Sequence, residues 1–227
     1  MNIQMKEDHY LVRDIWIPDL HSQAFCIFDL EGTGIHTAED DVIQMAAVRI
    51  NQDGEPGVSF SSLVHSHKPI PAFIEQLTGI RNEDLYEATA FGAVYLEFLD
   101  FIQNRILVTQ AGYEYDLPLL RRQCEENKVP FPGNKVLDIK VMFKAIHPDF
   151  EGIISTDRLI GYYGIDASAY KRHDALGDCH LIARLFNLIL SEYKQMNVHV
   201  LQVKEPLIIK RFRIEGMHTE PYETEYP

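Results

Sequence analysis

The sequence lacks any apolar run long enough to cross a membrane, and its N-terminus, MNIQMKEDHYLVRDIW, mixes charged and apolar residues throughout. A membrane-spanning helix needs about 20 consecutive apolar residues, and a signal peptide needs an apolar core. We therefore expect a cytoplasmic chain with no membrane partner. Cysteine is also scarce, because Cys26, Cys124 and Cys179 are far apart and odd in number. They show neither disulfide nor metal-ligand spacing, as is typical of a reducing compartment.

Positive charge is in short supply as well. Lys and Arg total 21 against 34 Asp and Glu, which gives a formal net charge of −13. Proteins that hold duplex nucleic acid by charge alone neutralise many phosphates with Lys and Arg, so this class is disfavoured. The balance does not exclude an enzyme whose clustered carboxylates bind divalent cations, because such ions neutralise part of the charge and can hold a phosphate.

The 227 residues suffice for one globular domain with appendages. Short apolar runs rich in strand-forming residues predict five strands, at 24–30, 41–50, 59–65, 106–109 and 136–139. Apolar residues at helical spacing predict helices at 71–77, 91–105, 115–127, 156–164 and from about 174 past 190, with Thr89 as N-cap of the second. Strands followed by strand–helix alternation indicate a three-layer α/β fold, in which helices flank a mixed five-stranded sheet.

Both chain ends are expected to lie outside this domain, which we place at residues 24–197. Residues 1–23 predict an N-terminal arm or strand anchored by Trp16, the single tryptophan. Residues 198–227 predict a C-terminal extension, whose acidic tail ends in EPYETEYP and is expected to be disordered.

The extension contains an apolar and basic segment, LIIKRFRI, at 207–214. One interpretation is a strand or arm packed on the domain, with Lys210, Arg211 and Arg213 in solvent. The other is a contact with substrate or a partner, since these cations stand out in an acidic chain. The sequence leaves both open.

Two carboxylates, Asp29 and Glu31, end the first predicted strand. Side chains alternate along a strand with period two, so both point to the same face, and their oxygens suit a hard cation such as Mg²⁺. The same spacing at Asp53 and Glu55 lies in a turn and predicts solvated surface. Context separates the two pairs: Asp29 follows an apolar run, and Gly32–Gly34 allows the backbone to approach a ligand closely.

Two further acidic elements follow. Asp116 comes after the strand predicted at 106–109, where a helix N-cap is the simpler interpretation. His173, Asp174 and Asp178 begin the last predicted helix. A solvated histidine and acids that favour a helix N-terminus would explain Asp174, but they explain Asp178 poorly, because it lies a full turn into the helix.

Together these elements resemble the DnaQ-like, or DEDDh, exonucleases of the RNase H-like superfamily. The family's first motif, Asp-x-Glu before a small-residue turn, is matched by FDLEGTG at 28–34. Its second motif ends in an aromatic residue and Asp, here at 115–116, and its third, His-x-Ala-x-x-Asp, is matched by HDALGD at 173–178. A Leu-Thr-Gly-Ile segment common in the family stands at 77–80. The resemblance spans roughly residues 24–195, in the family's order.

The chain departs from the family pattern at two places. The family usually has Thr after the motif Glu, where this chain has Gly32, and the second motif is commonly preceded by His-Asn-Ala, where this chain has AGYE at 111–114. These are supporting residues rather than metal ligands, so the departures bear on substrate handling and local rigidity more than on the reaction.

The resemblance implies an RNase H-like fold and a two-metal mechanism with two divalent cations, Mg²⁺ or Mn²⁺. It assigns Asp29 to both ions, Glu31 and Asp178 to the nucleophile-side ion, and Asp116 to the second. Such ions stabilise the attacking and leaving oxygens of an in-line displacement. The resemblance makes His173 the base that accepts a proton from the attacking water.

The implied substrate is the 3′ end of single-stranded DNA or RNA, with the backbone of Gly32, Thr33, Gly34 and Ile35 at the terminal nucleotide. Ile35 would pack against the last base or belong to the core. Two other functions remain: a catalytically silent nucleic-acid-binding domain on the same fold, and a phosphatase-like metal hydrolase acting on small nucleotides. The sequence does not choose between DNA, RNA and short oligonucleotides, and it allows a homodimer or larger complex.

Overall fold

The computed structural model describes residues 1–211 and 222–227. Its strands are β1 Asn2–Met5, β2 His9–Arg13, β3 Ile15–Ile17, β4 Phe25–Gly32, β5 Val42–Ile50, β6 Pro56–His65, β7 Thr89–Ala90, β8 Ile106–Thr109, β9 Val136–Asp138, β10 Leu201–Val203, β11 Leu207–Lys210 and β12 Tyr222–Glu225. Its α-helices are α1 Ala72–Thr78, α2 Asn82–Leu85, α3 Phe91–Ile102, α4 Asp116–Glu126, α5 Ile139–Ile146, α6 Thr156–Tyr163 and α7 Ala175–Gln195. Two 3₁₀ turns, η1 Leu20–Ser22 and η2 Ala167–Ala169, complete the set.

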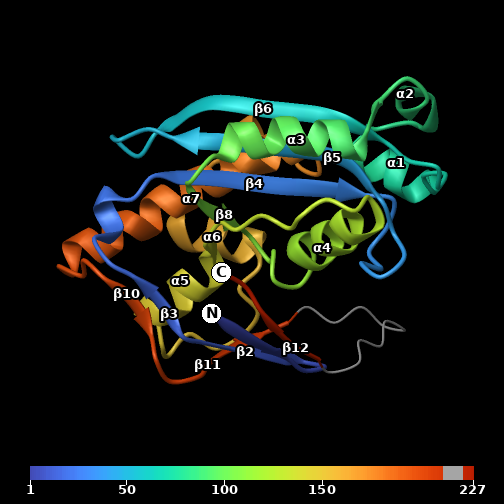
Figure 1. The fold of residues 1–227 in the computed structure, drawn as a ribbon. Helices are drawn as coiled ribbons and strands as arrows, with labels where there is room; N and C mark the ends of the chain where they lie inside the picture. The colour runs from blue at the N-terminus through green and yellow to red at the C-terminus, as the bar shows by residue number, and fades with distance from the viewer. Residues whose placement is uncertain (212–221) are drawn as a thin grey trace.

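A six-stranded mixed sheet with strand order β7-β6-β5-β4-β8-β9 forms the centre of the molecule. Strands β4, β5 and β6 are antiparallel to one another, whereas β8 and β9 continue the sheet in parallel with β4. Helices α3 and α7 both pack on β5 and β6 and lie on opposite sides of the sheet (Figure 1). The expected three-layer α/β fold, with helices on both faces of a mixed sheet, is therefore confirmed.

The predicted number of strands in the central sheet was wrong by one, since it has six and not five. The sixth strand, β7, is two residues long and pairs in parallel with the end of β6 at Val64 and His65. Thr89 belongs to this strand and does not cap α3, whose N-cap is Ala90 without a side-chain hydrogen bond. Two residues are too few for an alternating pattern, so the sequence carries no periodic signal for this strand.

Burial along β4 explains why this strand positions a site. Six of its eight residues are buried, and the two less buried positions are Asp29 and Glu31. The neighbouring strand β5 is buried at its first seven positions because it lies between α3 and α7. Asp29 and Glu31 are thus fixed in place by a strand whose other residues are packed in the core.

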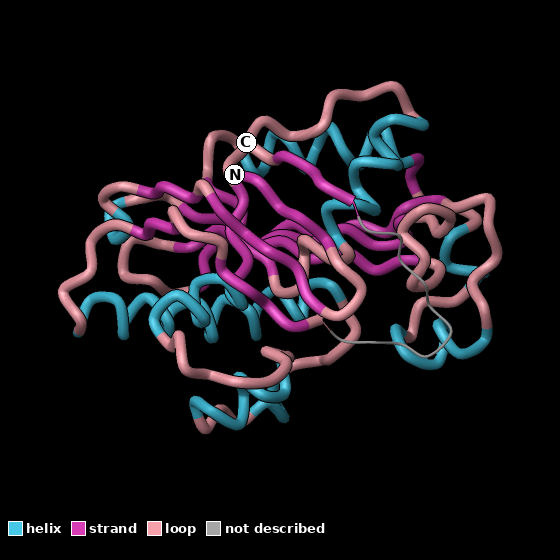
Figure 2. The backbone as a smooth tube through the Cα atoms, turned by 90° about the horizontal axis from the view of Figure 1, so that it is seen from below, coloured by secondary structure: helices cyan, strands magenta, loops and turns pink. Residues whose placement is uncertain are grey.

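A second, four-stranded sheet has the strand order β11-β2-β1-β12 and joins the two ends of the chain, which lie side by side in Figure 2. Asn2 of β1 pairs with Glu225 of β12, and the Met1 amino group donates to the Tyr226 carbonyl at 3.2 Å. The expected disorder of the acidic tail was therefore wrong for residues 222–227. The tail is ordered because β1 offers its free edge and because the Tyr226 ring is buried.

Strand β3 pairs with β10 in a separate two-stranded sheet, and here the predicted anchor was wrong. Trp16 is 56% exposed, while its neighbours Ile15 and Ile17 are buried. Period-two alternation explains the difference, since only every second side chain of this strand faces the core. The isoleucines anchor the arm, and Lys135 lies over the outward Trp16 ring.

The strand interpretation of the basic segment is confirmed for residues 207–210, which form β11 and pair with β2. Lys210 is exposed as expected, but Arg211 is buried and lies 3.4 Å from a Glu114 carboxylate oxygen. Arg213 and Ile214 fall outside the described residues. Arg211 therefore contributes to packing of the extension rather than to a solvated surface.

Among residues 1–211 and 222–227, no helix has the length and apolar character needed to cross a bilayer. The three cysteines are buried free thiols, in agreement with the absence of disulfide spacing.

Candidate active site

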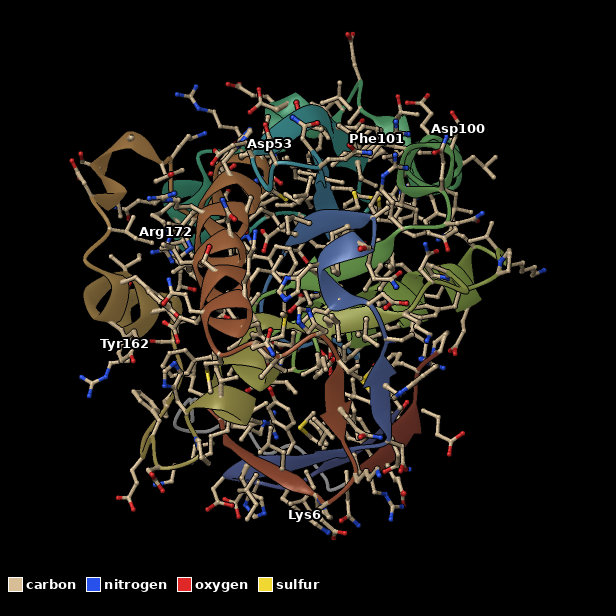
Figure 3. The ribbon with its side chains drawn as sticks, turned by 90° about the vertical axis from the view of Figure 1, so that its left-hand side faces the viewer. Lys6, Asp53, Asp100, Phe101, Tyr162 and Arg172 are labelled. Carbon is tan, nitrogen blue, oxygen red and sulfur yellow. The ribbon has the colours of Figure 1, made fainter. Side chains whose placement is uncertain are left out.

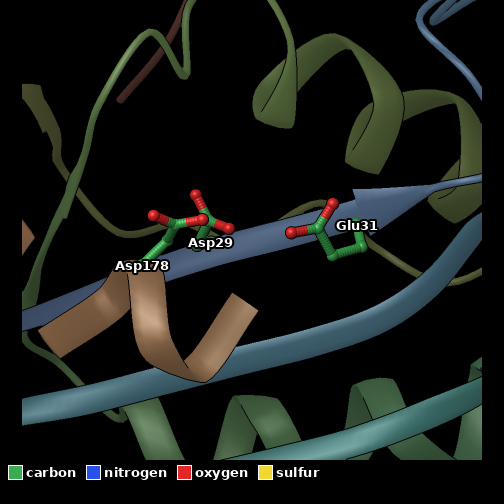
Figure 4. Close-up of side chains that lie close together, drawn as sticks. All are labelled: Asp29, Glu31 and Asp178. Carbon is green, nitrogen blue, oxygen red and sulfur yellow. The ribbon is translucent and has the colours of Figure 1, made fainter. Parts of the chain in front are cut away.

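Three carboxylates meet where the end of β4 faces the first turn of α7. Asp29, Glu31 and Asp178 each offer an oxygen, and these oxygens all lie within 4.8 Å of one another. Figure 4 shows Asp29 and Glu31 on the same side of β4, with Asp178 reaching toward them from the helix. Period-two alternation on the strand thus brings the predicted pair together, and the helix supplies the third acid from about 150 residues further along the chain.

The N-terminus of α7 is built to present Asp178. Asp174 is the helix N-cap, and its side chain accepts a hydrogen bond from the Gly177 backbone N–H at 3.1 Å. The Asp178 carboxylate accepts from Arg172 Nε at 2.8 Å and from the His173 backbone N–H at 2.7 Å. The interpretation of Asp174 as a helix-capping acid is confirmed, and Asp178 faces the cluster instead of solvent.

Asp116 lies immediately behind this group and is buried. Its carboxylate accepts from the Thr109 hydroxyl at 2.7 Å and from the Leu30 backbone N–H at 3.3 Å. Leu30 stands between the two β4 acids, so this hydrogen bond ties Asp116 to the strand that carries them. The simpler interpretation of Asp116 as an N-cap was wrong: α4 begins at Asp116 itself, and its N-cap is Tyr115.

Crowding of like charges in a half-buried place raises the pKa values of these acids. Burial, together with the neighbouring Asp116 and Glu31, raises the pKa of Asp29 well above its usual range. Burial and the Asp178 charge raise the pKa of Glu31 to about 8. Burial raises the pKa of Asp116 to about 7, against the opposing hydrogen bonds from Thr109 and Leu30. Near neutral pH this cluster therefore holds protons that a bound cation would release.

The turn after β4 explains the first departure from the family pattern. A Cβ atom on Gly32 would lie 2.4 Å from the Tyr115 hydroxyl oxygen, so any larger residue there would collide with it. That hydroxyl donates to the Gly34 carbonyl at 2.8 Å and closes the turn. Thr33 also donates to Asp40 at 3.0 Å. Gly32 and Tyr115 are thus sterically linked, and the turn over Gly32–Ile35 is held from two sides.

His173 lies on the same segment as Asp178, but its ring is not part of the cluster. The residue has a left-handed backbone with φ of 57° and is exposed. Within the described part of the chain, the ring has no hydrogen-bond partner. The structure thus brings Asp29, Glu31 and Asp178 together, with Asp116 hydrogen-bonded to the strand that carries the first two, and the His173 ring is not among the side chains that meet there. Ile35 is half-buried, which favours neither of its two interpretations.

Three side chains that organise this region were not predicted from the sequence. Gln44 on β5 accepts from the Ala175 backbone N–H at 2.9 Å and so fixes the start of α7. Arg172 pairs with Asp178, and the Tyr115 hydroxyl closes the turn over Gly32–Ile35. A polar residue inside the apolar run at 41–50 was the one available signal for Gln44. The other two depend on contacts between distant segments.

The second acidic pair, Asp53 and Glu55, has the spacing of Asp29 and Glu31 but is solvated, as predicted. Asp53 and Glu55 are exposed, and Asp53 accepts a hydrogen bond from the Glu55 backbone N–H at 3.0 Å. Identical spacing thus gives a solvated turn in one place and a cluster in the other. The donor set at the cluster consists of carboxylate oxygens alone, and such hard ligands fit divalent cations such as Mg²⁺ or Mn²⁺.

Comparison with known proteins places residues 26–186 within the family model described as Exonuclease. The chain is 30% identical over 186 residues to a DNA polymerase III PolC-type of Latilactobacillus sakei, matching 80% of this chain and 12% of that protein. It is 28% identical over 216 residues to the 3′-5′ exonuclease DinG of Bacillus subtilis, matching 88% and 22%. A DNA polymerase III subunit epsilon-like protein of Rhodobacter capsulatus is 34% identical over 177 residues, matching 77% and 25%. The chain therefore spans at most a quarter of the length of these relatives.

Solved structures show the same fold. The nuclease domain of 3′hExo, described as a DEDDh family member bound to rAMP, has a TM-score of 0.68 at 20% identity and covers 82% of this chain and 98% of its own. Exonuclease I of E. coli in complex with a dA16 oligonucleotide has a TM-score of 0.63 at 17% identity, covering 77% and 42%. The arrangement of sheet and helices is thus one that known nucleases share.

Proposed function

The chain belongs to this exonuclease family, of the DnaQ-like or DEDDh type, and from that premise we propose that it is a metal-dependent 3′–5′ exonuclease acting on single-stranded DNA or RNA. The observation that supports the proposal is the convergence of Asp29, Glu31 and Asp178, with Asp116 behind them. The acids come from two strand-end positions and two helix starts. Their types and order are those of the family's motifs.

In this proposal Asp29, Glu31, Asp178 and Asp116 hold two divalent cations, Mg²⁺ or Mn²⁺. When bound, the cations would supply electrostatic stabilisation of the attacking and leaving oxygens of the phosphodiester. The raised pKa values of Glu31 and Asp116 support this assignment, because carboxylates crowded in this way gain most from a cation. The catalytic unit is residues 24–197, with 1–23 and 198–227 as flanking segments.

The turn over Gly32, Thr33, Gly34 and Ile35 is proposed to receive the 3′-terminal nucleotide. Its support is the closure of the turn by Tyr115 and Asp40 beside the acidic cluster. A closed turn presents its backbone in a fixed place, which favours recognition of one chain end. Single-stranded ends should be cut faster than blunt duplex, because unpairing a terminal base costs energy.

His173 is proposed as the base that accepts a proton from the attacking water. Its backbone N–H is bonded to Asp178, so a turn of its exposed ring would bring the imidazole toward the cluster. We expect His173→Ala, assayed at saturating Mn²⁺ across pH, to lower the rate roughly 10²–10⁴-fold and to remove the acid limb near neutrality. Mn²⁺ affinity should change little. A variant that retains both the limb and most of its rate would exclude His173 as the base.

The proposed function is tested by following matched single-stranded DNA and RNA labelled at the 3′ or the 5′ end. A 3′–5′ exonuclease releases labelled mononucleotide from the 3′ label at once and gives a descending ladder from the 5′ label. EDTA should stop the reaction, and Mg²⁺ or Mn²⁺ should restore it. A 3′-phosphate should block it.

Three other results would each replace the proposal. Binding without metal-dependent cleavage would indicate a silent nucleic-acid-binding domain. Preference for a free nucleotide over an oligomer would indicate a small-nucleotide hydrolase, and cuts in a circular substrate would indicate an endonuclease.

A further inference from the structure

Arg172 forms an ionic bridge between α6 and α7. Its Nε donates to Asp178 at 2.8 Å, and its NH1 nitrogen donates to Asp157 of α6 at 2.9 Å. Figure 3 shows Arg172 in the space between these two helices. The guanidinium is held by one acid of the carboxylate cluster and by one acid outside it. The two acids differ in burial, since the Asp178 side chain is 13% exposed and that of Asp157 is 85% exposed.

The charge of Arg172 acts on more than its direct partner. It favours the ionised form of Asp29 and so opposes the rise in that residue's pKa. The guanidinium therefore lies within electrostatic reach of two of the three acids that meet at the cluster. A cation bound by Asp29 and Asp178 would be of the same sign as Arg172 and would share a carboxylate with it. Two cations at one carboxylate repel each other, and the repulsion is weakly screened in a half-buried place.

We propose that Arg172 competes with a divalent cation for the Asp178 carboxylate, and that Asp157, its other partner, retains the guanidinium when the cation binds. This inference rests on the metal-binding part of the proposed function. It assigns Arg172 as a residue that sets the metal affinity of the site. The bond from the His173 backbone N–H to the second oxygen of Asp178 keeps that carboxylate oriented after Arg172 moves away.

The sign of one measurement separates a competitor from a structural brace. If Arg172 only braced Asp178, its removal would misplace a ligand and weaken metal binding. If Arg172 competes, its removal relieves repulsion and strengthens metal binding. We therefore expect the Mn²⁺ affinity of Arg172→Met, measured on the full chain by calorimetry or electron paramagnetic resonance, to rise roughly tenfold.

A matched control is Arg158→Met, which removes the same charge from an exposed position on α6 and should leave Mn²⁺ affinity unchanged. Arg172→Lys keeps the charge and should bind Mn²⁺ more nearly like wild type than Arg172→Met does, and a thermal melt of each variant shows whether it is folded. Asp157→Asn should weaken Mn²⁺ binding about two- to threefold, because Asp178 is then the one carboxylate left to Arg172 in this bridge. The same change made in Arg172→Met should have no effect if Asp157 acts through the arginine.

Unchanged or weaker Mn²⁺ binding by folded Arg172→Met, or the same loss on Asp157→Asn in both backgrounds, would overturn the inference. Failure of the proposed function looks different. Wild-type protein would then bind no Mn²⁺, or Asp29→Asn would bind it as well as wild type. If Mn²⁺ affinity falls in Asp29→Asn but is unchanged in Arg172→Met, only the proposed role of Arg172 is refuted.

Discussion

Two groups of charged side chains share the segment 113–116, which supplies Glu114 to one and Asp116 to the other, and they are organised in opposite ways. Toward the terminal sheet lies an ion-paired cluster made of Glu114, Lys140, Arg211 and Asp138. Glu114 pairs with Lys140 and with Arg211, and Asp138 accepts from the Lys140 backbone N–H at 2.8 Å. Toward α7 lies the carboxylate cluster of the candidate active site, in which acids face acids.

The difference teaches how a buried charge can be assigned to fold or to function. Burial raises the pKa of Asp138 to about 6, and the Lys140 charge limits the rise. Burial and the facing Asp178 raise the pKa of Glu31 to about 8. The ion-paired cluster contains its own counter-charges, since Lys140 and Arg211 both pair with Glu114. The carboxylate cluster is short of them, and an added cation would gain most there.

Removing one acid from the carboxylate cluster should give the largest effect of all. Asp29→Asn or Asp178→Asn should lower cleavage by roughly 10³-fold or more, since metal stabilisation of the transition state is worth several kcal/mol and each 1.36 kcal/mol is tenfold. The thermal midpoint of Asp29→Asn without added metal should change little near neutral pH, because the raised pKa of Asp29 already favours its uncharged form. Asp53→Asn has the same chemistry at the solvated pair and should change neither quantity. A cleavage rate near wild type would refute the site.

Breaking the ion-paired cluster should instead act mainly on the free energy of unfolding. Glu114→Gln leaves Lys140 and Arg211 without their shared carboxylate, and removing one partner of a buried pair costs about 3–5 kcal/mol of unfolding free energy. Denaturant unfolding measures this loss. Arg81→Met, which breaks an exposed pair with Glu83, is the control and should leave the unfolding midpoint unchanged. A loss no greater than that of the control would mean that the two clusters do not differ as described.

The pH dependence of stability should follow the carboxylate cluster. A folded-state pKa raised above the unfolded value gives stability that is present at low pH and lost as pH rises. For Glu31 the window runs from about 4.5 to about 8, so metal-free protein should lose stability across it. A change of about 1 kcal/mol corresponds to about 2–4 °C in Tm for a chain of this size. Mg²⁺ or Mn²⁺ should restore more stability at pH 8 than at pH 5, as thermal melts with and without EDTA would show. A metal effect independent of pH would contradict this.

The smallest expected effects concern Tyr115 and the glycine it contacts, Gly32. Tyr115→Phe removes one hydrogen bond to Gly34, worth about 1 kcal/mol. Gly32→Thr restores the family's residue but collides with the Tyr115 hydroxyl, at a cost of about 1–3 kcal/mol. The double variant should lose less unfolding free energy than the sum of the singles, because the first change makes room for the second. Additive losses would mean that the two positions are independent.

The sequence predicted what local patterns encode. Alternation placed Asp29 and Glu31 on one face of a strand, and the position of Asp178 one turn into a helix excluded simple capping. The fold class followed from the order of strands and helices. The β1–β12 pairing could not follow, because it joins Asn2 to Glu225 across almost the entire chain and no local signal sets that register. The bonds of Arg172 and the Tyr115 hydroxyl likewise depend on how distant segments pack.

The closeness of the two chain ends has a consequence for engineering. Because the Met1 amino group meets the Tyr226 carbonyl, a short linker could join the ends into a ring without stretching either strand. New ends could then open at the exposed turn around Asp53 and Gly54, leaving the β1–β12 seam continuous. For the same reason the chain could be inserted into a single loop of a host protein, because its two ends would then connect to neighbouring residues of that loop.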